Sequence, residues 1–339
     1  MNEYAELKRR LRSGGVFHRQ LRYYGLQAVL SVALLAFPFA LLLFSPPVWL
    51  QLIAAAFLAV AFTRLAFIFH DAGHRQIFGS PRQNDCVMLL VGVLTGSSAS
   101  WWFKTHNQHH CNPNDLDLDP STALPILAFS EEQARERRGL LKSVIRFQAY
   151  YFFPLLCLEA MGARLASVLF LINGKSKYPL IEAPGMVAHF LIYGSLLFAL
   201  LPVEEALLFI LVHQCLFGFY MGSVFAPNHK GMPIQTETPG LSFFDRQIRS
   251  SRNIKPSPLG DFWLGGLSYQ IEHHLFPSIP RNKLKEARVI TRHYCLEHSI
   301  PYYETSVWRA YAEVLWFLHR VVAPLRDTRQ VREEVQQNM

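Results

Sequence analysis

The sequence has 339 residues, of which 51% are hydrophobic and only 17% are charged, with a formal net charge of +8. Average soluble domains carry about 25% charged residues, so this composition disfavours a purely soluble protein and is typical of a membrane protein with sizeable soluble parts. The positive charge fits the cytosolic Lys and Arg of membrane proteins better than a nucleic-acid partner, and the five scattered cysteines, without C-x-x-C spacing, argue against a disulfide framework or a thiolate zinc site.

Four apolar segments are each close to the roughly 20 residues that a helix needs to cross a bilayer. They lie at about residues 26–44, 48–69, 185–201 and 206–225. Pro46 and Pro47 separate the first two segments, and Pro202 to Glu205 separate the last two, which predicts two helical hairpins. The charged N-terminal stretch, MNEYAELKRRLRSGG, has no apolar core beside a cleavage site, so we expect no cleaved signal peptide.

Basic residues predict how the four spans are oriented. Neither hairpin turn contains Lys or Arg, whereas the segments before and between the hairpins are rich in both. The positive-inside rule therefore places both turns outside and both termini in the cytosol. The second and fourth spans then end on the cytosolic side, near His70 and His229.

Two further apolar segments are not expected to span. Val87 to Gly96 is too short, and we interpret it as re-entrant, interfacial or packed in the core. Phe147 to Ile172 is long enough but carries Glu159 and Arg164 near its middle, which favours one interfacial amphipathic helix. Two other helices are predicted, at residues 130–145 and from about Ser306 to Val322.

Eight of the 14 histidines form a pattern typical of metal ligands. The motifs HDAGH, HNQHH and QIEHH space their imidazoles so that they share one helix face, and a further histidine follows the fourth span. The eight are His70, His74, His106, His109, His110, His229, His273 and His274. Eight imidazoles are too many for one ion and suit two ions in a shared pocket.

Imidazole binds Zn, Fe, Cu and Ni alike, but zinc has no redox chemistry. A nitrogen-rich site for two metals beside a lipid phase therefore favours iron and O2. The remaining histidines are interpreted differently. His189 and His213 lie within predicted spans, where a helix–helix hydrogen bond is the expected role. Surface or packing roles are expected for His18, His293, His298 and His319.

At these motifs the sequence resembles the membrane fatty acid desaturases. HDAGH, HNQHH and QIEHH are similar to their three histidine boxes. The third, within GGLSYQIEHHLFP from Gly265 to Pro277, resembles the box of front-end (Δ5/Δ6-like) and related acyl-CoA or acyl-lipid desaturases. The resemblance runs from about Val48 to Pro280.

The resemblance implies an all-α integral membrane protein with a four-helix transmembrane stem under a cytosolic helical cap. Residues 1–339 would form one domain, with the cap at about 70–180 and 230–339. All eight histidines would be catalytic ligands of a di-iron centre (Fe2+/Fe3+) on the cytosolic face, at the inner membrane if the cell is bacterial. The implied reaction is O2-dependent desaturation of a fatty acyl chain on CoA or a lipid.

Two features depart from the family pattern. Gln270 stands where other branches have His, and it either ligates through its side-chain oxygen, binds through water or orients its neighbours. The HPGG haem motif of a fused cytochrome b5 does not occur, and only about 25 residues precede the first span. Electrons are therefore expected from a separate ferredoxin, cytochrome b5 or flavin reductase.

Polar residues near the boxes are expected to orient the ligands, because a ligating His normally donates its other N–H. They are Asp71, Asn107, Asp115, Asp119, Asn228 and Glu272. A solvated loop is the alternative for Asp115, Asp117 and Asp119.

Substrate contacts are expected at two places. Trp101 and Trp102 either line a tunnel for the acyl chain or anchor at the membrane interface, where Trp is enriched. A basic stretch before the third box either meets an anionic headgroup or CoA phosphates, or forms a solvated surface. It contains Arg246, Arg249, Arg252 and Lys255.

Three rival functions remain open at this point. A di-iron lipid hydroxylase or epoxygenase shares the same boxes. A membrane zinc hydrolase would need fewer histidines and no electron donor. A metal transporter should place its ligands near the middle of its spans, whereas these clusters lie at span ends or in soluble segments.

Overall fold

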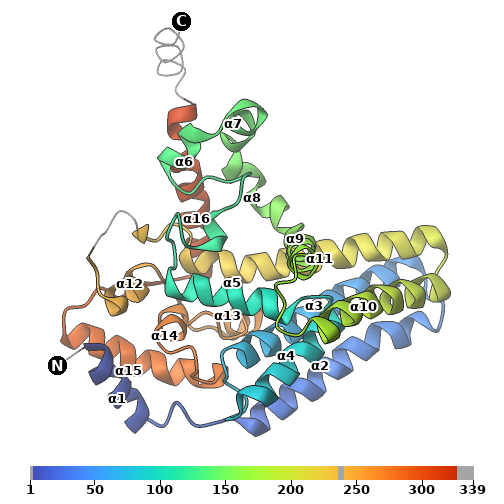
Figure 1. Cartoon of the computed structure of the whole chain (residues 1–339), viewed down its shortest axis with the longest axis horizontal. Coiled ribbons are helices and arrows are strands. Elements are labelled where there is room, and N and C mark those ends of the chain that lie inside the picture. The colour runs from blue at the N-terminus through green and yellow to red at the C-terminus, as the bar shows by residue number, and fades with distance from the viewer. Residues whose placement is uncertain (1–2, 236–239, 327–339) are drawn as a thin grey trace, which may run out of the picture.

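The computed structural model describes residues 3–235 and 240–326 (Figure 1). Four long helices run side by side toward one end of the molecule, and the shorter elements gather at the other end (Figure 1). The long helices are α2 (Leu21–Leu42), α3 (Val48–Gly73), α10 (Pro179–Leu200) and α11 (Val203–His229). Each is long and apolar enough to cross a membrane, which confirms the four predicted segments.

The other described elements are shorter, and only one small parallel sheet occurs among the described residues, where Asn253 lies opposite Glu304. Their bounds are α1 (Glu3–Ser13), α4 (Pro81–Thr95), α5 (Ala99–Cys111), η1 (Pro120–Thr122), α6 (Glu131–Glu136), α7 (Gly139–Ile145), α8 (Gln148–Leu156), α9 (Glu159–Ile172), α12 (Phe243–Arg249), β1 (Asn253–Ile254), α13 (Pro258–Trp263), α14 (Gln270–Leu275), η3 (Arg281–Lys283), α15 (Leu284–Glu297), β2 (Glu304–Thr305), α16 (Val307–Val321) and η4 (Ala323–Leu325).

The four long helices divide into an inner and an outer pair. In the most apolar 18-residue stretch of each helix, the buried share is 61% for α3 and 50% for α11. It is only 17% for both α2 and α10. The outer helices expose large apolar residues such as Val29 and Leu191, which is favourable only against lipid. The inner pair packs through a shared core that includes Leu58, Phe62 and Phe209. This distribution supports an integral membrane protein.

The chain turns sharply between α4 and α5, which are bent by 111°. Gly96 ends α4 at φ 71, a left-handed conformation that favours glycine. A Cβ there would lie only 2.5 Å from the ring of His189. Ser98 then starts α5 by accepting a hydrogen bond from the Trp101 N–H. The turn agrees with the expected re-entrant or packed segment and directs α5, with its three histidines, back into the molecule.

The predicted single helix from Phe147 to Ile172 is wrong, because α8 and α9 are separate helices bent by 72°. Pro154 lacks the N–H that would continue the hydrogen-bond ladder. The last turn of α8 closes instead with tighter bonds from Cys157 N to Pro154 O (3.2 Å) and from Leu158 N to Leu155 O (2.9 Å).

The predicted helix at residues 130–145 is also interrupted. Between α6 and α7, Arg137 has an extended backbone and its guanidinium donates to the carbonyl oxygens of Leu124 and Leu127 at 3.3 Å each. These hydrogen bonds stabilise the interruption between α6 and α7. The helix predicted from about Ser306 is confirmed as α16, which begins after Ser306.

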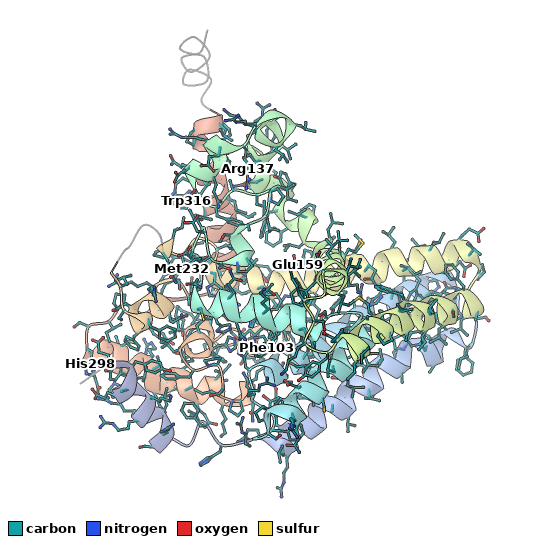
Figure 2. All side chains as sticks on the ribbon, viewed as in Figure 1. Phe103, Arg137, Glu159, Met232, His298 and Trp316 are labelled. Carbon is teal, nitrogen blue, oxygen red and sulfur yellow. The ribbon has the colours of Figure 1, made fainter. Side chains whose placement is uncertain are left out.

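Five of the six histidines outside the eight lie as expected. His18, His293, His298 and His319 are exposed, and His298 lies at the edge of the molecule (Figure 2). His213 Nδ1 lies 2.7 Å from the Tyr193 hydroxyl, which joins α11 to α10 by the expected hydrogen bond. The ring of His189 stacks on Tyr193.

Close packing of α11 on the α8–α9 junction gives a first prediction. A Cβ on Gly218 would lie 2.6 Å from the carbonyl oxygen of Cys157. Gly218→Ala should therefore destabilise the fold by about 1–3 kcal/mol through overpacking. Thermal unfolding in detergent measures the effect.

The matched control is Gly194→Ala in α10, where an added Cβ would meet nothing within 4 Å. Alanine favours a helix over glycine by about 1 kcal/mol, so this variant should be neutral or stabilised. Equal melting temperatures for the two variants would contradict the packing interpretation.

Candidate metal centre

The structure brings all eight motif histidines together from four helices and the residue that ends α3. His70 and His229 lie in the last turns of α3 and α11, and His74 directly follows α3. Helix α5 carries His106, His109 and His110, and α14 carries His273 and His274. Segments more than 200 residues apart in the chain thus meet at one place.

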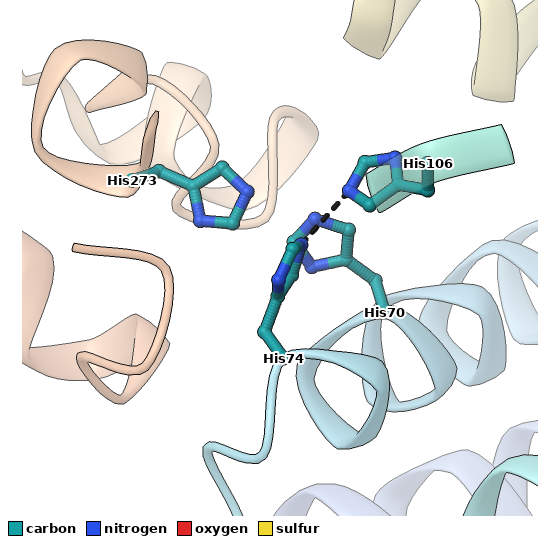
Figure 3. Close-up of side chains that lie close together, drawn as sticks. All are labelled: His70, His74, His106 and His273. Carbon is teal, nitrogen blue, oxygen red and sulfur yellow. Dashed lines mark hydrogen bonds between the residues drawn. The ribbon is translucent and has the colours of Figure 1, made fainter. Parts of the chain in front are cut away.

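The imidazoles form two groups. In the first histidine group, one ligand atom from each residue lies within 4.8 Å of all the others, and its members are His70, His74, His106 and His273 (Figure 3). The second histidine group meets the same criterion with His109, His229 and His274. The eighth residue, His110, lies between the groups: its ring stacks on His274 at 4.1 Å, and its Nε2 is 3.1 Å from His106 Nε2.

Local structure explains how α3 delivers its two histidines. The helix continues past the apolar segment through Asp71, Ala72 and Gly73. It ends just before Arg75, which adopts φ 60. Gly73 is required by the site itself, because a Cβ there would lie 2.3 Å from the Trp102 ring. Trp102 in turn stacks on His106, with ring centroids 4.1 Å apart.

Burial keeps these imidazoles neutral. Desolvation lowers the pKa well below 6.5, and neighbouring imidazoles lower the pKa further. This holds for His74, His106, His110, His273 and His274. Neutral imidazole is the form that binds metal ions, so these side chains are in the ligating state at physiological pH.

Two aspartates fix the orientation of two of the histidine rings. His70 Nδ1 lies 3.2 Å from Asp71 Oδ1, and His109 Nδ1 lies 2.9 Å from Asp119 Oδ2. Because a carboxylate only accepts, each Nδ1 carries the proton and each Nε2 keeps its lone pair. Burial alone would raise the pKa of Asp119, but the interaction with His109 holds that pKa well below its ordinary value.

Two neutral acceptors do the same for the second histidine group. His229 Nδ1 lies 2.9 Å from the Ser250 carbonyl oxygen, and His274 Nδ1 lies 2.9 Å from Gln247 Oε1. Gln247 is held in this orientation by donating through Nε2 to the His110 carbonyl oxygen at 2.8 Å. All three members of the second group therefore direct an unprotonated Nε2 away from their supporting partners.

Unsatisfied nitrogens show that these residues fit metal ions. Both ring nitrogens of His273, Nε2 of His274 and Nδ1 of His110 are buried without a hydrogen-bond partner. Each such atom costs about 1–3 kcal/mol if nothing binds it. His74 Nε2 and His106 Nε2 approach to 2.8 Å (Figure 3). Two groups of converging imidazoles match the chemistry of two imidazole-binding cations such as iron.

A buried ion pair supports the first histidine group. Arg281 Nε lies 2.8 Å from Asp71 Oδ2, and both side chains are almost fully buried. Although burial would lower the pKa of Arg281, the adjacent Asp71 carboxylate raises it. The chain of contacts runs from Arg281 through Asp71 to His70. Arg281, Gln247 and Ser250 were missed by the sequence analysis, although Gln247 does share a buried helix face with Phe244 and Ile248.

Gln270 lies beside the second histidine group. Its Nε2 is 2.9 Å from His229 Nε2, and its Oε1 is buried without a partner. Glu272, expected near the ligands, instead accepts hydrogen bonds from Asn253 (2.7 Å) and Tyr302 (2.9 Å), and burial raises the pKa of Glu272 to about 7. This network anchors α14, since Asn253 Oδ1 also accepts from the Ile271 N–H.

The other expected orienting residues lie as follows. Asn228 donates to Val224 O, and Asn107 has no side-chain hydrogen bond to any described residue. Asp115 Oδ1 accepts from the N–H groups of Asp117 and Leu118, which fits the loop alternative for these two aspartates. Asp119 alone of the three contacts a box histidine.

The expected substrate residues differ in placement. Trp102 lies directly against the first histidine group, and Trp101 is partly buried beside it in the chain. Arg249 is exposed. Arg252 is fully buried, pairs with Glu313 and donates to Lys230 O. Its guanidinium is therefore engaged inside the protein, which corrects both expected alternatives for Arg252, a contact with an external phosphate and a place on a solvated surface.

The role of Gln247 leads to a second prediction. Gln247→Met removes the acceptor of His274 Nδ1, so the ring loses its fixed tautomer, and metal affinity should fall about 10- to 100-fold. Metal retention during titration with a chelator measures this change.

Gln148→Met is the matched control. Gln148 is equally buried and bonds only backbone groups of Ala128 and Leu318, far from the histidines. It should lose stability but keep its metal affinity. The same loss of metal affinity in both variants would show that Gln247 acts only through folding.

Comparisons with known proteins agree on one family. A family model described as fatty acid desaturase matches residues 47–306. The Delta(8)-fatty-acid desaturase of Helianthus annuus is 30% identical over 301 residues, covering 84% of this chain and 65% of that protein. The Acyl-lipid (9-3)-desaturase of Physcomitrium patens is 27% identical over 338 residues, with 95% and 63% covered. The Delta(6)-fatty-acid desaturase fat-3 of Caenorhabditis elegans is 27% identical over 330 residues, with 92% and 73% covered. The chain spans just under two thirds of the length of the first two relatives.

Proposed function

Because the chain belongs to the fatty acid desaturase family, we propose that it catalyses O2-dependent desaturation of a fatty acyl chain at a histidine-ligated di-iron centre. The observation that carries the proposal is the convergence of eight histidines, seven of them in two groups with His110 between, where several ring nitrogens are buried without a hydrogen-bond partner. In the reaction, the acyl chain loses two hydrogens from adjacent carbons and becomes an alkene. O2 is reduced to two waters, with two electrons from a separate donor and two protons.

The eight histidines would hold two iron ions, which supply O2 activation when bound. The protein's own contribution is to fix the rings and exclude water. Asp71, Asp119, Gln247 and Ser250 hold four Nδ1 protons in place, so each corresponding Nε2 keeps its lone pair. Gln270, within reach of His229, either adds a side-chain oxygen ligand, acts through water or orients His229.

The proposed substrate is an acyl-CoA or acyl-lipid whose chain passes Trp102. This ring packs against His70 and His106, so an acyl segment placed beside it is also beside the first histidine group. The electron donor is a ferredoxin, cytochrome b5 or flavin reductase. We place the cap on the cytosolic face, since the basic segments flank the spans at the end that carries His70 and His229.

A transporter or a zinc hydrolase fits less well. The histidines of α3 and α11 occupy the last turns of these helices rather than their middles. Zinc sites typically use three or four protein ligands, whereas eight imidazoles meet here.

Expression in a host that lacks the activity tests the proposal. Mass spectrometry of the host's acyl chains should show a loss of two hydrogens, and purified protein should consume O2 only with added reductant. A gain of one oxygen would instead assign a hydroxylase or epoxygenase. Full turnover by a zinc-only protein without reductant would reject the oxygenase class.

A further inference from the structure

A cavity of about 430 Å3 lies where α2 and α3 meet α13 and the loop of Gly265 and Gly266. Helix α2 contributes Gln27, Leu30 and Leu34 to its wall, and α3 contributes Arg64. None of the eight box histidines lines it. The cavity is therefore a feature separate from the candidate metal centre.

Arg64 is the unusual member of this wall. It belongs to a membrane-spanning helix, yet among the described residues its guanidinium has no ion pair or hydrogen bond. Its contact is with the ring of Phe262, at 4.3 Å from the centroid. A charged group in a span is costly unless it is paired, so an unpaired one beside a cavity indicates a ligand.

The other charges around the cavity leave this cation uncompensated. Arg281 is paired with Asp71, and Lys285 lies 3.7 Å from Asp261. The wall thus carries three cations, Arg64, Arg281 and Lys285. It carries one carboxylate, Asp261, and a second carboxylate, Asp71, lies behind it. The excess positive charge fits an anionic group that accepts several hydrogen bonds, because guanidinium and ammonium offer only donors.

The position of Arg64 indicates which kind of molecule the anionic group belongs to. Arg64 precedes His70 by six residues, or about 9 Å along the helix axis, so it lies in the half of α3 that leads to the metal centre. Leu30, on the same wall, is 48% exposed on the lipid-facing helix α2. A polar head in the cavity would therefore continue into apolar chains along α2.

We propose that this cavity binds an anionic phospholipid, with its phosphate on Arg64 and Lys285 and an acyl chain along Leu30 and Leu34. The lipid is a bound component of the membrane region rather than the reacting substrate, because the cavity does not reach the histidines. The proposal does not depend on the desaturase activity, and its test measures binding alone.

Native mass spectrometry of the delipidated full chain tests the proposal, with phosphatidylglycerol as the probe. Arg64→Gln should weaken binding about tenfold or more, since hydrogen bonds to charged groups are the strong ones. Arg146→Gln is the matched control, because Arg146 also packs on an aromatic ring, Phe147, without an ion pair but lies away from the cavity. Its binding should be unchanged.

Two further arms identify the source of the anion. Diacylglycerol, which lacks phosphate, should bind far more weakly than phosphatidylglycerol. Inorganic phosphate that bound as tightly as the lipid would assign the site to free phosphate and overturn the lipid proposal. Equal binding by Arg64→Gln and the unaltered protein would overturn the site itself.

Lys285→Gln covers the case in which Arg64→Gln does not fold. Lys285 is largely exposed, so its loss does not threaten the fold. It should weaken phosphatidylglycerol binding about twofold or more. Unchanged binding in this variant also contradicts the proposal.

Discussion

His274→Ala should abolish product formation while the protein still folds and inserts. The substitution removes one of three imidazoles from the second histidine group, and it also removes the ring that stacks on His110. Product formation should fall more than about 100-fold, because even the loss of a residue that only supports a ligand costs 10- to 100-fold. Product yield per inserted protein, with metal content measured in parallel, checks the expectation.

His298→Ala is the matched control for this experiment. His298 is exposed, bonds only the Tyr294 carbonyl oxygen and lies at the edge of the molecule (Figure 2). It should keep full activity and full metal content. Turnover close to that of the unaltered protein in His274→Ala would count against the ligand assignment, whatever the control shows.

Arg281→Met should cause a large loss of stability. The substitution leaves the Asp71 carboxylate buried without its partner, and breaking a buried ion pair in this way typically costs about 3–5 kcal/mol. The free energy of unfolding in mixed micelles measures the effect. Arg135→Met, which breaks the exposed pair with Glu131, should change little.

The double variant Asp71→Asn/Arg281→Met separates folding from ligand orientation. Removing both charges should restore much of the stability, because no unpaired ion remains. Asparagine carries no charge and is a weaker acceptor for His70 Nδ1, so metal affinity in the first histidine group should stay reduced. If the double variant is as unstable as Arg281→Met, the ion pair is not the cause of the loss.

The spans and the histidine motifs were readable from sequence because their signals are local. Apolar length and the prolines of the two turns located the four spans, although α2 and α10 begin five and six residues earlier than predicted. The helices α3 and α11 nevertheless extend four residues beyond the predicted ends, through polar residues that the apolar criterion cannot include. Those extra turns carry His70 and His229 into the site.

Proline was a poor guide to helix breaks. Pro154 accompanies the bend between α8 and α9, whereas Pro38, Pro184 and Pro227 lie inside continuous helices. In membrane helices neighbouring groups can satisfy the freed carbonyl, so the outcome depends on packing that a single sequence does not reveal.

The features of the site that could not be predicted from the sequence depend on long-range contacts. Arg281 reaches Asp71 across about 210 residues of chain, and Ser250 contributes only a backbone oxygen to His229. Neither has a local sequence signature. The division into two histidine groups was equally hidden, because each group mixes residues from different motifs and depends on how α3, α5, α11 and α14 cross. The sequence analysis placed Arg252 on the surface because its partner, Glu313, is distant in sequence.

Metal content of the purified full chain tests the central claim most directly. The two histidine groups predict about two iron ions per chain, since eight imidazoles exceed the ligands of one ion. Stripping the iron with a chelator should abolish product formation, and reloading iron should restore it. Full product formation by protein that contains no iron would contradict the account.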